Sequence, residues 1–300
     1  MEQGVNKQLV KARIKRTLYV SAVDLMRLSG VSRVRRLADR PDSLRVLMYH
    51  KINGIPHNPI TVAPDAFARQ QDYLRKNYCV ISLAELLDSM EGGRPLPSRA
   101  VLLTFDDGYL DNLEAAHGIL KAAGHRALIF IPTGFVGETR PFHHDSHLAF
   151  ANPTLNWDQI RKMQDVFDIG SHGVSHRIMT RIPREEAKHE IRESKAILER
   201  ELGHEVAAFS YPNGSIADYD DDLEKTVIDA GYRICFTTIP RTNISGFNRF
   251  QVSRYNVEDY GMKYFAGLLD GSSDLLGLKD THFGYEVKRF VNRIAGGPSK

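Results

Sequence analysis

Two acidic residues and two histidines of this chain are spaced as they would be around a metal ion. Asp106 and Asp107 follow an apolar run and precede a glycine, and His172 and His176 lie four residues apart after a later apolar run. Adjacent carboxylates at the end of a buried strand are costly to ionise without a cation nearby. Two imidazoles and one carboxylate leave open coordination positions for water and substrate, as a catalytic divalent ion requires. A lone histidine or an Asp-Asp-Gly turn is commonplace, so the hypothesis of metal catalysis depends on the whole set.

These residues must be positioned by strands, because they follow short, continuous apolar runs. Such runs suit strands that are buried on both faces, as in parallel sheets. Strands are predicted at 45–50, 100–105, 127–131, 167–170, 207–210 and 234–238, with a last strand end at 252–255. Helices are predicted between them at 66–77, 82–90, 111–123, 157–164, 183–203 and 217–231. This alternation predicts a single α/β domain with a parallel sheet.

Further polar residues stand at the ends of the predicted strands. His50 ends the first run, residues 210–214 follow a later one, and Arg254 lies near the last strand end. In parallel α/β folds, active sites collect at the carboxyl ends of the strands. Together with the aspartate and histidine pairs, these residues are therefore expected to place acids, imidazoles and a guanidinium on one rim.

The composition indicates a globular chain with a large core. Of its 300 residues, 42% are hydrophobic and 26% charged, which excludes a fibrous or fully disordered protein. Cys79 and Cys235 lie far apart, which excludes a disulfide framework, a zinc ribbon and a thioredoxin motif. Residues 1–40 contain ten Lys and Arg and three Asp and Glu, which gives them a net charge of +7. Because the whole chain carries +3, the remaining 260 residues carry a net charge of −4. We therefore expect no nucleic acid partner for the body.

The basic leader, residues 1–43, has the pattern of an amphipathic helix. Its most apolar run, 18–23, is short and is followed at once by Asp24, so no cleavable signal peptide is evident, and no stretch reaches the ~18 apolar residues of a transmembrane helix. Such a helix can lie in a membrane interface with Lys and Arg near anionic head groups, or it can pack on the outside of the body. We expect peripheral membrane contact through residues 1–40 and a cytoplasmic location at the inner face of the membrane.

Three motifs carry a resemblance to a known family. They are Thr104-Phe105-Asp106-Asp107-Gly108, Ser171-His172-Gly173-Val174-Ser175-His176 and Phe209-Ser210-Tyr211-Pro212-Asn213-Gly214, with Leu47-Met48-Tyr49-His50 and Leu155-Asn156-Trp157-Asp158 typical of one branch. Over residues 44–265 the chain resembles the polysaccharide deacetylase (NodB-homology) family, carbohydrate esterase family 4. The resemblance implies a distorted (β/α) barrel with fewer strands than a regular one. We therefore predict a barrel at 44–270 and a peripheral tail at 271–300.

The resemblance also implies a role for each site residue. Asp107, His172 and His176 would bind one divalent metal ion, usually zinc. Asp106 would be the general base that takes a proton from the attacking water. A backbone N–H at Asn213 would help to hold the tetrahedral oxyanion.

The leaving amine needs a protonated histidine as its general acid. In many members of the family this histidine follows the other motifs, but the Met-Tyr-His branch resembles a circular permutation. His50 is therefore our candidate, and His282 in the weakly patterned tail is the alternative.

Two positions depart from the family pattern. Ser210 stands where the third motif usually has an arginine that pairs with the base, and Arg254 is expected to supply the missing guanidinium. Gly173 replaces the usual Ser or Thr after the first metal histidine. Neither change removes a metal ligand, so the enzyme prediction stands.

A histidine-rich loop lies within the long polar excursion 132–156. It contains His143, His144, Asp145 and His147. These residues could form a second metal site or part of the substrate groove. Because no apolar frame is evident to fix their geometry, we expect a polar loop at the mouth of the cleft.

Three functions are compatible with these observations. We favour a metal-dependent N-deacetylase that hydrolyses the C–N bond of N-acetylated sugars in a surface polysaccharide or its precursor. The alternatives are hydrolysis of a non-sugar amide and a catalytically silent glycan-binding protein on the same fold. The intact aspartate and histidine pairs argue against the silent protein.

Overall fold

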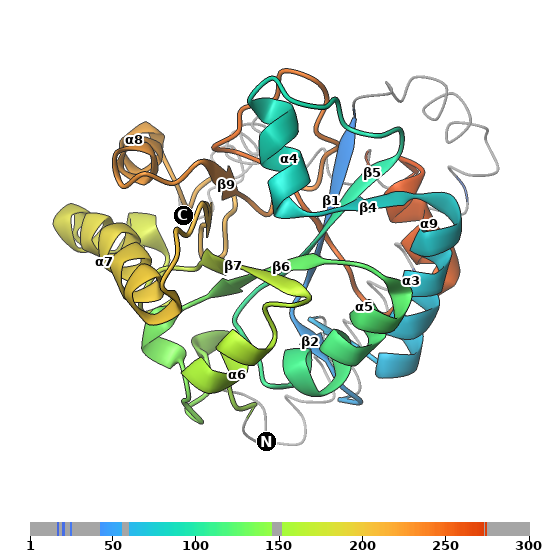
Figure 1. Ribbon diagram of the computed structural model, residues 1–300, viewed down its shortest axis with the longest axis horizontal. Helices are drawn as coiled ribbons and strands as arrows, with labels where there is room; N and C mark the ends of the chain where they lie inside the picture. Colours follow the sequence, from blue (N-terminus) through green and yellow to red (C-terminus); the bar gives the residue numbers. More distant parts are fainter. Residues whose placement is uncertain are drawn as a thin grey trace, which may run out of the picture.

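The body of the protein is built on one curled sheet of parallel strands (Figure 1). The computed structural model describes residues 43–55, 60–145, 152–272 and 274, together with helical positions 17, 20, 21 and 25. The strands are β1 (Leu44–Tyr49), β4 (Cys79–Ile81), β5 (Ala100–Phe105), β6 (Ala127–Ile131), β7 (Phe167–Ser171), β8 (Ala208–Ser210), β9 (Ile234–Phe236) and β10 (Tyr255–Asn256). Their order is β10-β1-β5-β6-β7-β8-β9, with β4 beside β5, and two further short strands, β2 (Lys51–Ile52) and β3 (Thr61–Val62), pair separately.

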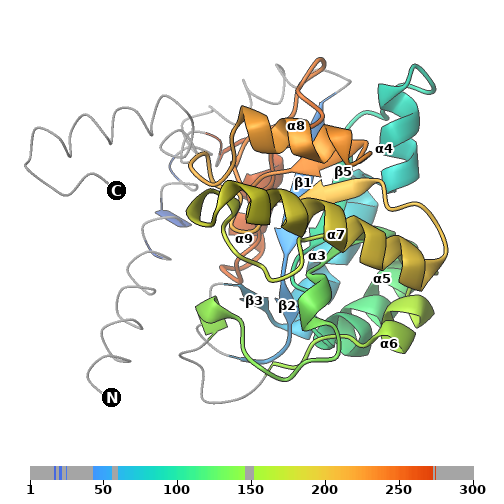
Figure 2. The ribbon, with the colours of Figure 1, turned by 90° about the vertical axis from the view of Figure 1, so that its left-hand side faces the viewer.

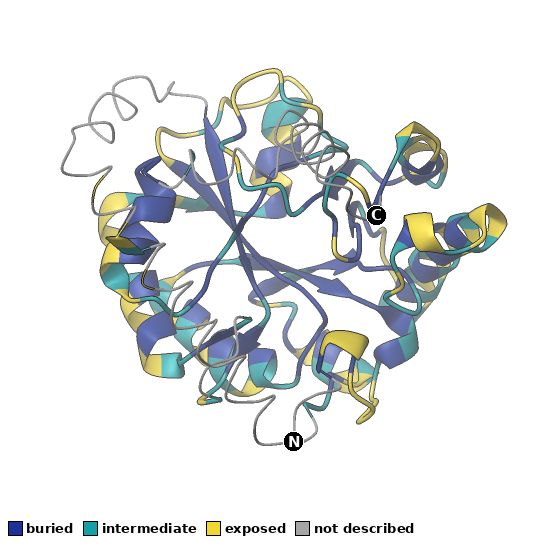
Figure 3. Ribbon diagram, turned by 180° about the vertical axis from the view of Figure 1, so that it is seen from behind, coloured by how far each residue is buried: buried dark blue, intermediate teal, exposed yellow. Residues whose placement is uncertain are grey.

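Helices surround this sheet. They are α3 (Pro64–Asn77), α4 (Leu83–Met90), α5 (His117–Ala123), α6 (Trp157–Lys162), α7 (Arg184–Leu202), α8 (Asp221–Asp229) and α9 (Met262–Leu269). Figure 1 shows the strands crossing in the centre with the helices outside them, and Figure 2 shows α7 and α8 side by side. In Figure 3 the strands are mostly buried, whereas the outward faces of the helices are exposed. This arrangement confirms the predicted distorted (β/α) barrel.

A short segment before β10 links the two edges of the sheet. Val252 pairs with β9, since its carbonyl accepts from Thr237 N–H at 2.9 Å and its N–H donates to the Cys235 carbonyl at 2.9 Å. Three residues later Tyr255 pairs with Leu47 of β1. Residues between these two pairings, Arg254 among them, are thereby carried across the gap between the edge strands.

Alternation along the strands separates an inward face from an outward one. On β5, Ala100 and Leu102 point to the inside of the barrel and belong to a hydrophobic cluster that also includes residues of α4. Val101, Leu103 and Phe105 belong instead to the larger cluster that the outer helices cover. Residues 100, 102, 104 and 106 share the same face, because side chains alternate along a strand. Asp106 is therefore expected to point into the barrel.

The sequence predicted most elements within a few residues of their bounds, but α9 and the short strands β2, β3 and β4 were missed. β4 is only three residues long, Cys79-Val80-Ile81. Helix α9 buries six of its eight residues, so it lacks the one-sided apolar spacing by which a surface helix is recognised. The predicted helix at 111–123 begins with a π-helical turn, Asn112–Ala116, and the one predicted at 217–231 begins only at Asp221, where the Asp220 side chain accepts from Leu223 N–H.

Most of the predicted leader, His282 and nearly all of the predicted tail lie outside the described residues. Of the four described positions in residues 1–40, Val20 is half-buried and packs against the larger core cluster, whereas Leu25 is exposed. Within the described part of the chain, no helix is long and apolar enough to cross a membrane.

Candidate active site

The carboxyl ends of β1, β5, β7 and β8 bring the predicted residues together. Asp106 N–H donates to the Tyr49 carbonyl at 3.0 Å, which fixes the end of β5 beside His50. His172 N–H donates to the Ile131 carbonyl at 3.0 Å, which continues the pairing of β7 with β6. His172 Nε2 then lies 3.9 Å from Asp106 Oδ2 and 3.8 Å from Asp107 Oδ1.

Arg254 supplies the guanidinium that the third motif lacks. Its Nη1 and Nη2 donate to Asp106 Oδ1 and Oδ2 at 2.7 and 2.8 Å, a bidentate pair in which both side chains are buried. Ser210, at the position of the missing arginine, accepts from Arg254 Nη2 through its hydroxyl at 2.8 Å. Burial works to raise the pKa of Asp106, but the Arg254 charge and His172 outweigh it and hold that pKa below its usual value.

Asp107 is a buried carboxylate whose surroundings suit a cation. His176 Nε2 lies 3.0 Å from its Oδ1. Within the part of the chain that the structure describes, neither carboxylate oxygen receives a hydrogen bond of normal geometry. Burial works to raise the pKa of Asp107, but the nearby imidazoles of His176 and His144 hold it well below the usual range. An ionised carboxylate left in this state is a candidate metal ligand.

The tautomer of His172 also suits metal binding. Its Nδ1 lies 2.7 Å from the Ser210 carbonyl oxygen, which can only accept, so Nδ1 carries the proton and Nε2 presents its lone pair to the aspartates. Burial lowers the pKa of His172 to about 4. The imidazole is therefore neutral at neutral pH, as a metal ligand must be.

The turn from His172 to His176 is held by a buried glutamate that the sequence gave no reason to single out. Glu190 on α7 accepts from Val174 N–H at 2.7 Å and from Ser175 N–H at 2.8 Å. The same carboxylate explains why residue 173 is glycine. Gly173 has φ +74°, and a Cβ there would lie 3.0 Å from Met179 Cε and 3.2 Å from Glu190 Oε2.

His50 lies at this rim as predicted, on the end of β1. The side-chain amide of Asn112, in the π-helical turn, donates to the His50 carbonyl at 2.8 Å. His50 Nδ1 is buried and has no hydrogen-bond partner among the described residues. Burial lowers the pKa of His50, and the charges of Asp107 and Asp106 work in the opposite direction.

Asn213 occupies the predicted turn after β8. It adopts φ +62°, in the left-handed region. Its carbonyl accepts from the Thr238 hydroxyl at 2.7 Å, and its side chain donates to Asp218. The backbone at Asn213 is thus held in one conformation, as an oxyanion-binding N–H requires.

The prediction that the histidine-rich loop lacks an apolar frame is wrong. Phe142 stacks on Phe135 with 4.1 Å between ring centroids, and Tyr109 joins them in a small buried cluster. His144 stacks on Phe142 and lies with its Nε2 3.4 Å from Asp107 Oδ2. Phe135 and Phe142 lie within the polar excursion itself, but the sequence interpretation did not recognise them as a frame, and Tyr109, which completes the cluster, comes from a distant part of the chain. His147 lies outside the described residues.

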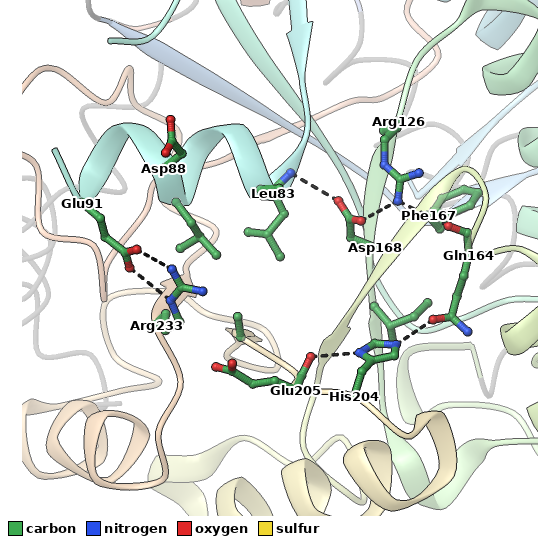
Figure 4. Close-up of a pocket in the computed structure, with 14 residues that line it drawn as sticks. Leu83, Asp88, Glu91, Arg126, Gln164, Phe167, Asp168, His204, Glu205 and Arg233 are labelled. Atoms are coloured by element: carbon green, nitrogen blue, oxygen red, sulfur yellow. Dashed lines mark hydrogen bonds and ion pairs between the residues drawn. The ribbon is translucent and has the colours of Figure 1, made fainter. Parts of the chain in front are cut away.

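A separate cavity of about 570 Å³ lies at the other end of the sheet, below α4. It is lined by the amino ends of β6, β7 and β8, and Figure 4 shows two ion pairs among its lining residues, Arg233 with Glu91 and Arg126 with Asp168. None of the predicted catalytic residues lines it. The cavity is therefore distinct from the rim that carries the chemistry.

Comparison with known proteins agrees with this fold. Residues 93–235 match the family model for polysaccharide deacetylase. The protein YxkH of Bacillus subtilis (strain 168) is 28% identical over 204 residues, which cover 67% of each chain. Poly-β-1,6-N-acetyl-D-glucosamine N-deacetylase of Escherichia coli (strain K12) is 30% identical over 122 residues, which cover 38% of this chain but only 18% of that enzyme.

Solved structures show the same fold. IcaB from Ammonifex degensii superimposes with a TM-score of 0.65 at 24% identity, covering 77% of this chain and 97% of IcaB. The Streptococcus pyogenes deacetylase PplD gives a TM-score of 0.63 at 23% identity, covering 73% of this chain and 94% of PplD. The chain is therefore similar in sequence to polysaccharide deacetylases over residues 93–235, and it shares the NodB-type fold of these solved deacetylase structures.

Proposed function

We propose that this chain is a metal-dependent N-deacetylase that removes acetyl groups from N-acetylated sugars of a surface polysaccharide or its precursor. The observation that carries the proposal is the buried carboxylate of Asp107, which lacks hydrogen bonds among the described residues and faces two imidazoles beside the Arg254-held Asp106. The Escherichia coli relative, named for the deacetylation of poly-β-1,6-N-acetyl-D-glucosamine, supports the substrate class.

Two ligand-atom separations in the predicted set suit a zinc ion, although the described residues whose ligand atoms all lie within 4.8 Å of one another are Asp107, His144 and His176, without His172. Ligand atoms bound tetrahedrally at about 2.0–2.2 Å lie roughly 3.4 Å apart. The Nε2 atoms of His176 and His172 lie 3.0 and 3.8 Å from Asp107 Oδ1, on either side of that value. A divalent ion held by these three residues would polarise the amide carbonyl and lower the pKa of a coordinated water.

The remaining residues have roles that follow from their geometry. Asp106 is the general base, since each of its oxygens keeps a lone pair beyond the one that Arg254 occupies. Arg254 fixes the plane of that carboxylate. His50 donates a proton to the leaving amine, and the backbone N–H of Asn213 stabilises the developing oxyanion.

Acetate release from oligomers of β-1,6-linked N-acetylglucosamine tests the proposal. We expect release to stop when the protein is stripped with a chelator and to return when Zn²⁺ is added back. Asp107→Ala should abolish it, whereas Asp165→Ala, at an exposed carboxylate paired with Lys121, should not. Full activity of the stripped protein would contradict the metal dependence. Hydrolysis of a non-sugar amide without any acetate release from N-acetylated sugars would instead favour the alternative hydrolase.

We also propose that residues 1–40 contact an anionic membrane surface from the cytoplasmic side. Their net charge of +7 supports this proposal, whereas the packing of Val20 against the core favours a leader that lies on the body. Deletion of residues 1–40 should abolish sedimentation with anionic vesicles and leave deacetylation intact. Unchanged sedimentation, or an insoluble truncated body, would favour the packed leader.

A further inference from the structure

A third imidazole, that of His144, lies beside the candidate metal ligands and has no role in the mechanism above. Its Nε2 is 3.4 Å from Asp107 Oδ2, and its ring lies 5.5 Å from that of His176. One ligand atom from each of Asp107, His144 and His176 can be chosen so that all lie within 4.8 Å of one another. This spacing is what a single bound ion requires of its ligands.

The plane of the His144 ring is set by aromatic packing. His144 stacks on Phe142 with 5.3 Å between centroids and 8° between planes. Phe142 is itself fully buried, stacked on Phe135 and in edge contact with Tyr109 at 5.4 Å. The imidazole therefore has a fixed orientation that does not depend on a bound ion.

A buried ion pair between Lys51 and Asp145 anchors the histidine-rich loop to the strand ends that carry the active-site residues. Lys51 Nζ lies 2.6 Å from Asp145 Oδ2, and the two side chains are 0% and 2% exposed. The Tyr109 hydroxyl donates to Asp145 Oδ2 at 2.7 Å and lies 2.9 Å from His144 Nε2. Burying two charges is expensive, and fixing the register of packed elements is the best-attested use of such a pair. Because Lys51 follows His50 and Tyr109 follows the aspartate pair, the loop is tied to the rim at both places.

We propose that His144 is a further protein ligand of the divalent ion that Asp107, His172 and His176 hold. The inference rests on the metal dependence proposed above. Four protein ligands would fill a tetrahedral ion, whereas a catalytic site keeps a position open. Either the ion takes more than four ligands or His144 gives way when substrate binds. In both cases His144 tightens metal binding in the free enzyme.

Zinc affinity of the full chain, measured by competition with a chromophoric chelator, tests this role without any activity assay. His144→Phe keeps the stack on Phe142 but removes the ligand atom, and His144→Ala removes both. The matched control is His143→Phe, at the exposed neighbour on the same turn. We expect zinc to bind about tenfold more weakly, or worse, to both His144 variants and unchanged to the control. The Tyr109 hydroxyl gives its proton to Asp145 and can only accept from His144 Nε2, so this nitrogen must lose its proton when zinc binds; Tyr109→Phe removes the competing acceptor and should not weaken zinc binding.

Co²⁺ provides a second readout, because its visible absorption depends on coordination. The spectrum of the Co²⁺-loaded protein should change in His144→Phe and stay the same in His143→Phe. Wild-type affinity and an unchanged spectrum in His144→Phe would overturn the inference alone and leave the proposed function standing. A wild-type chain that binds neither ion would overturn both.

Discussion

Replacing Arg254 by methionine tests the pairing on which Asp106 depends. The substitution keeps a long apolar side chain but leaves a carboxylate that is fully buried without its cation. It also removes donors to the Thr237 carbonyl and the Ser210 hydroxyl. Breaking a buried pair from one side typically costs about 3–5 kcal/mol of unfolding free energy. Urea unfolding at neutral pH should therefore show a loss of this size.

The pH dependence of that loss follows from the sign of the pKa change. In the wild type the pKa of Asp106 is depressed, so its contribution to stability is present above the unfolded-state pKa and is lost only as the pH falls through the lower folded-state value. Without the Arg254 charge, which is the largest effect that lowers the pKa of Asp106, we expect burial to raise that pKa above the unfolded-state value. The variant should then lose more stability at pH 7 than at pH 4, where the carboxyl can take up a proton.

Two further variants separate this effect from general damage. Arg254→Met combined with Asp106→Asn should recover part of the lost stability at pH 7, because no charge then remains unpaired. Arg233→Met breaks the ion pair with Glu91 on the surface, where the partners are 38% and 44% exposed, and should cost far less. The reasoning is refuted if Arg254→Met costs no more than this control or if the double variant recovers nothing.

Three other substitutions probe the chemistry and its support. Asp106→Asn should retain zinc but lose about 10²–10⁴-fold in turnover, because an amide cannot accept the water proton; near-normal turnover would remove Asp106 from the role of base. Glu190→Gln should loosen the turn between the metal histidines and weaken zinc binding by about tenfold, whereas the exposed Glu185→Gln on the same helix should not; equal zinc affinities in a chelator competition would rule the effect out. His50→Ala should reduce turnover of an N-acetylated sugar far more than that of phenyl acetate, whose leaving group needs little protonation; equal losses would exclude His50 as the general acid.

The parts of the site that the sequence predicts are those fixed by strand periodicity. A buried strand alternates its faces, so the position of Asp106 after β5 and of His172 after β7 is determined once each strand is recognised. Arg254 was also expected at the rim, although its pairing depends on the segment that links β9 to β1. That linkage is tertiary, and only the structure shows that the guanidinium reaches Asp106.

The contributions of Glu190 and His144 could not be predicted in the same way. Glu190 sits in a charged helix, and nothing in the spacing of that helix marks one glutamate as a buried acceptor. His144 is positioned by Phe142, two residues before it, and by Tyr109, which comes from a distant part of the chain. Contacts between distant segments leave no local pattern, so a polar stretch with an aromatic support reads in the sequence as a polar loop.

Three residues of the candidate active site have strained backbone conformations. Asp107, His176 and Asn213 all adopt positive φ, at +73°, +56° and +62°. A non-glycine residue in such a conformation typically costs about 1–3 kcal/mol and persists only where its surroundings enforce it. Here Glu190 holds the turn before His176, and Asp218 holds the turn at Asn213. The buried carboxylates on the helices and loops therefore stabilise a rim whose own backbone is unfavourable, which is why we expect their loss to weaken metal binding before it affects the sheet.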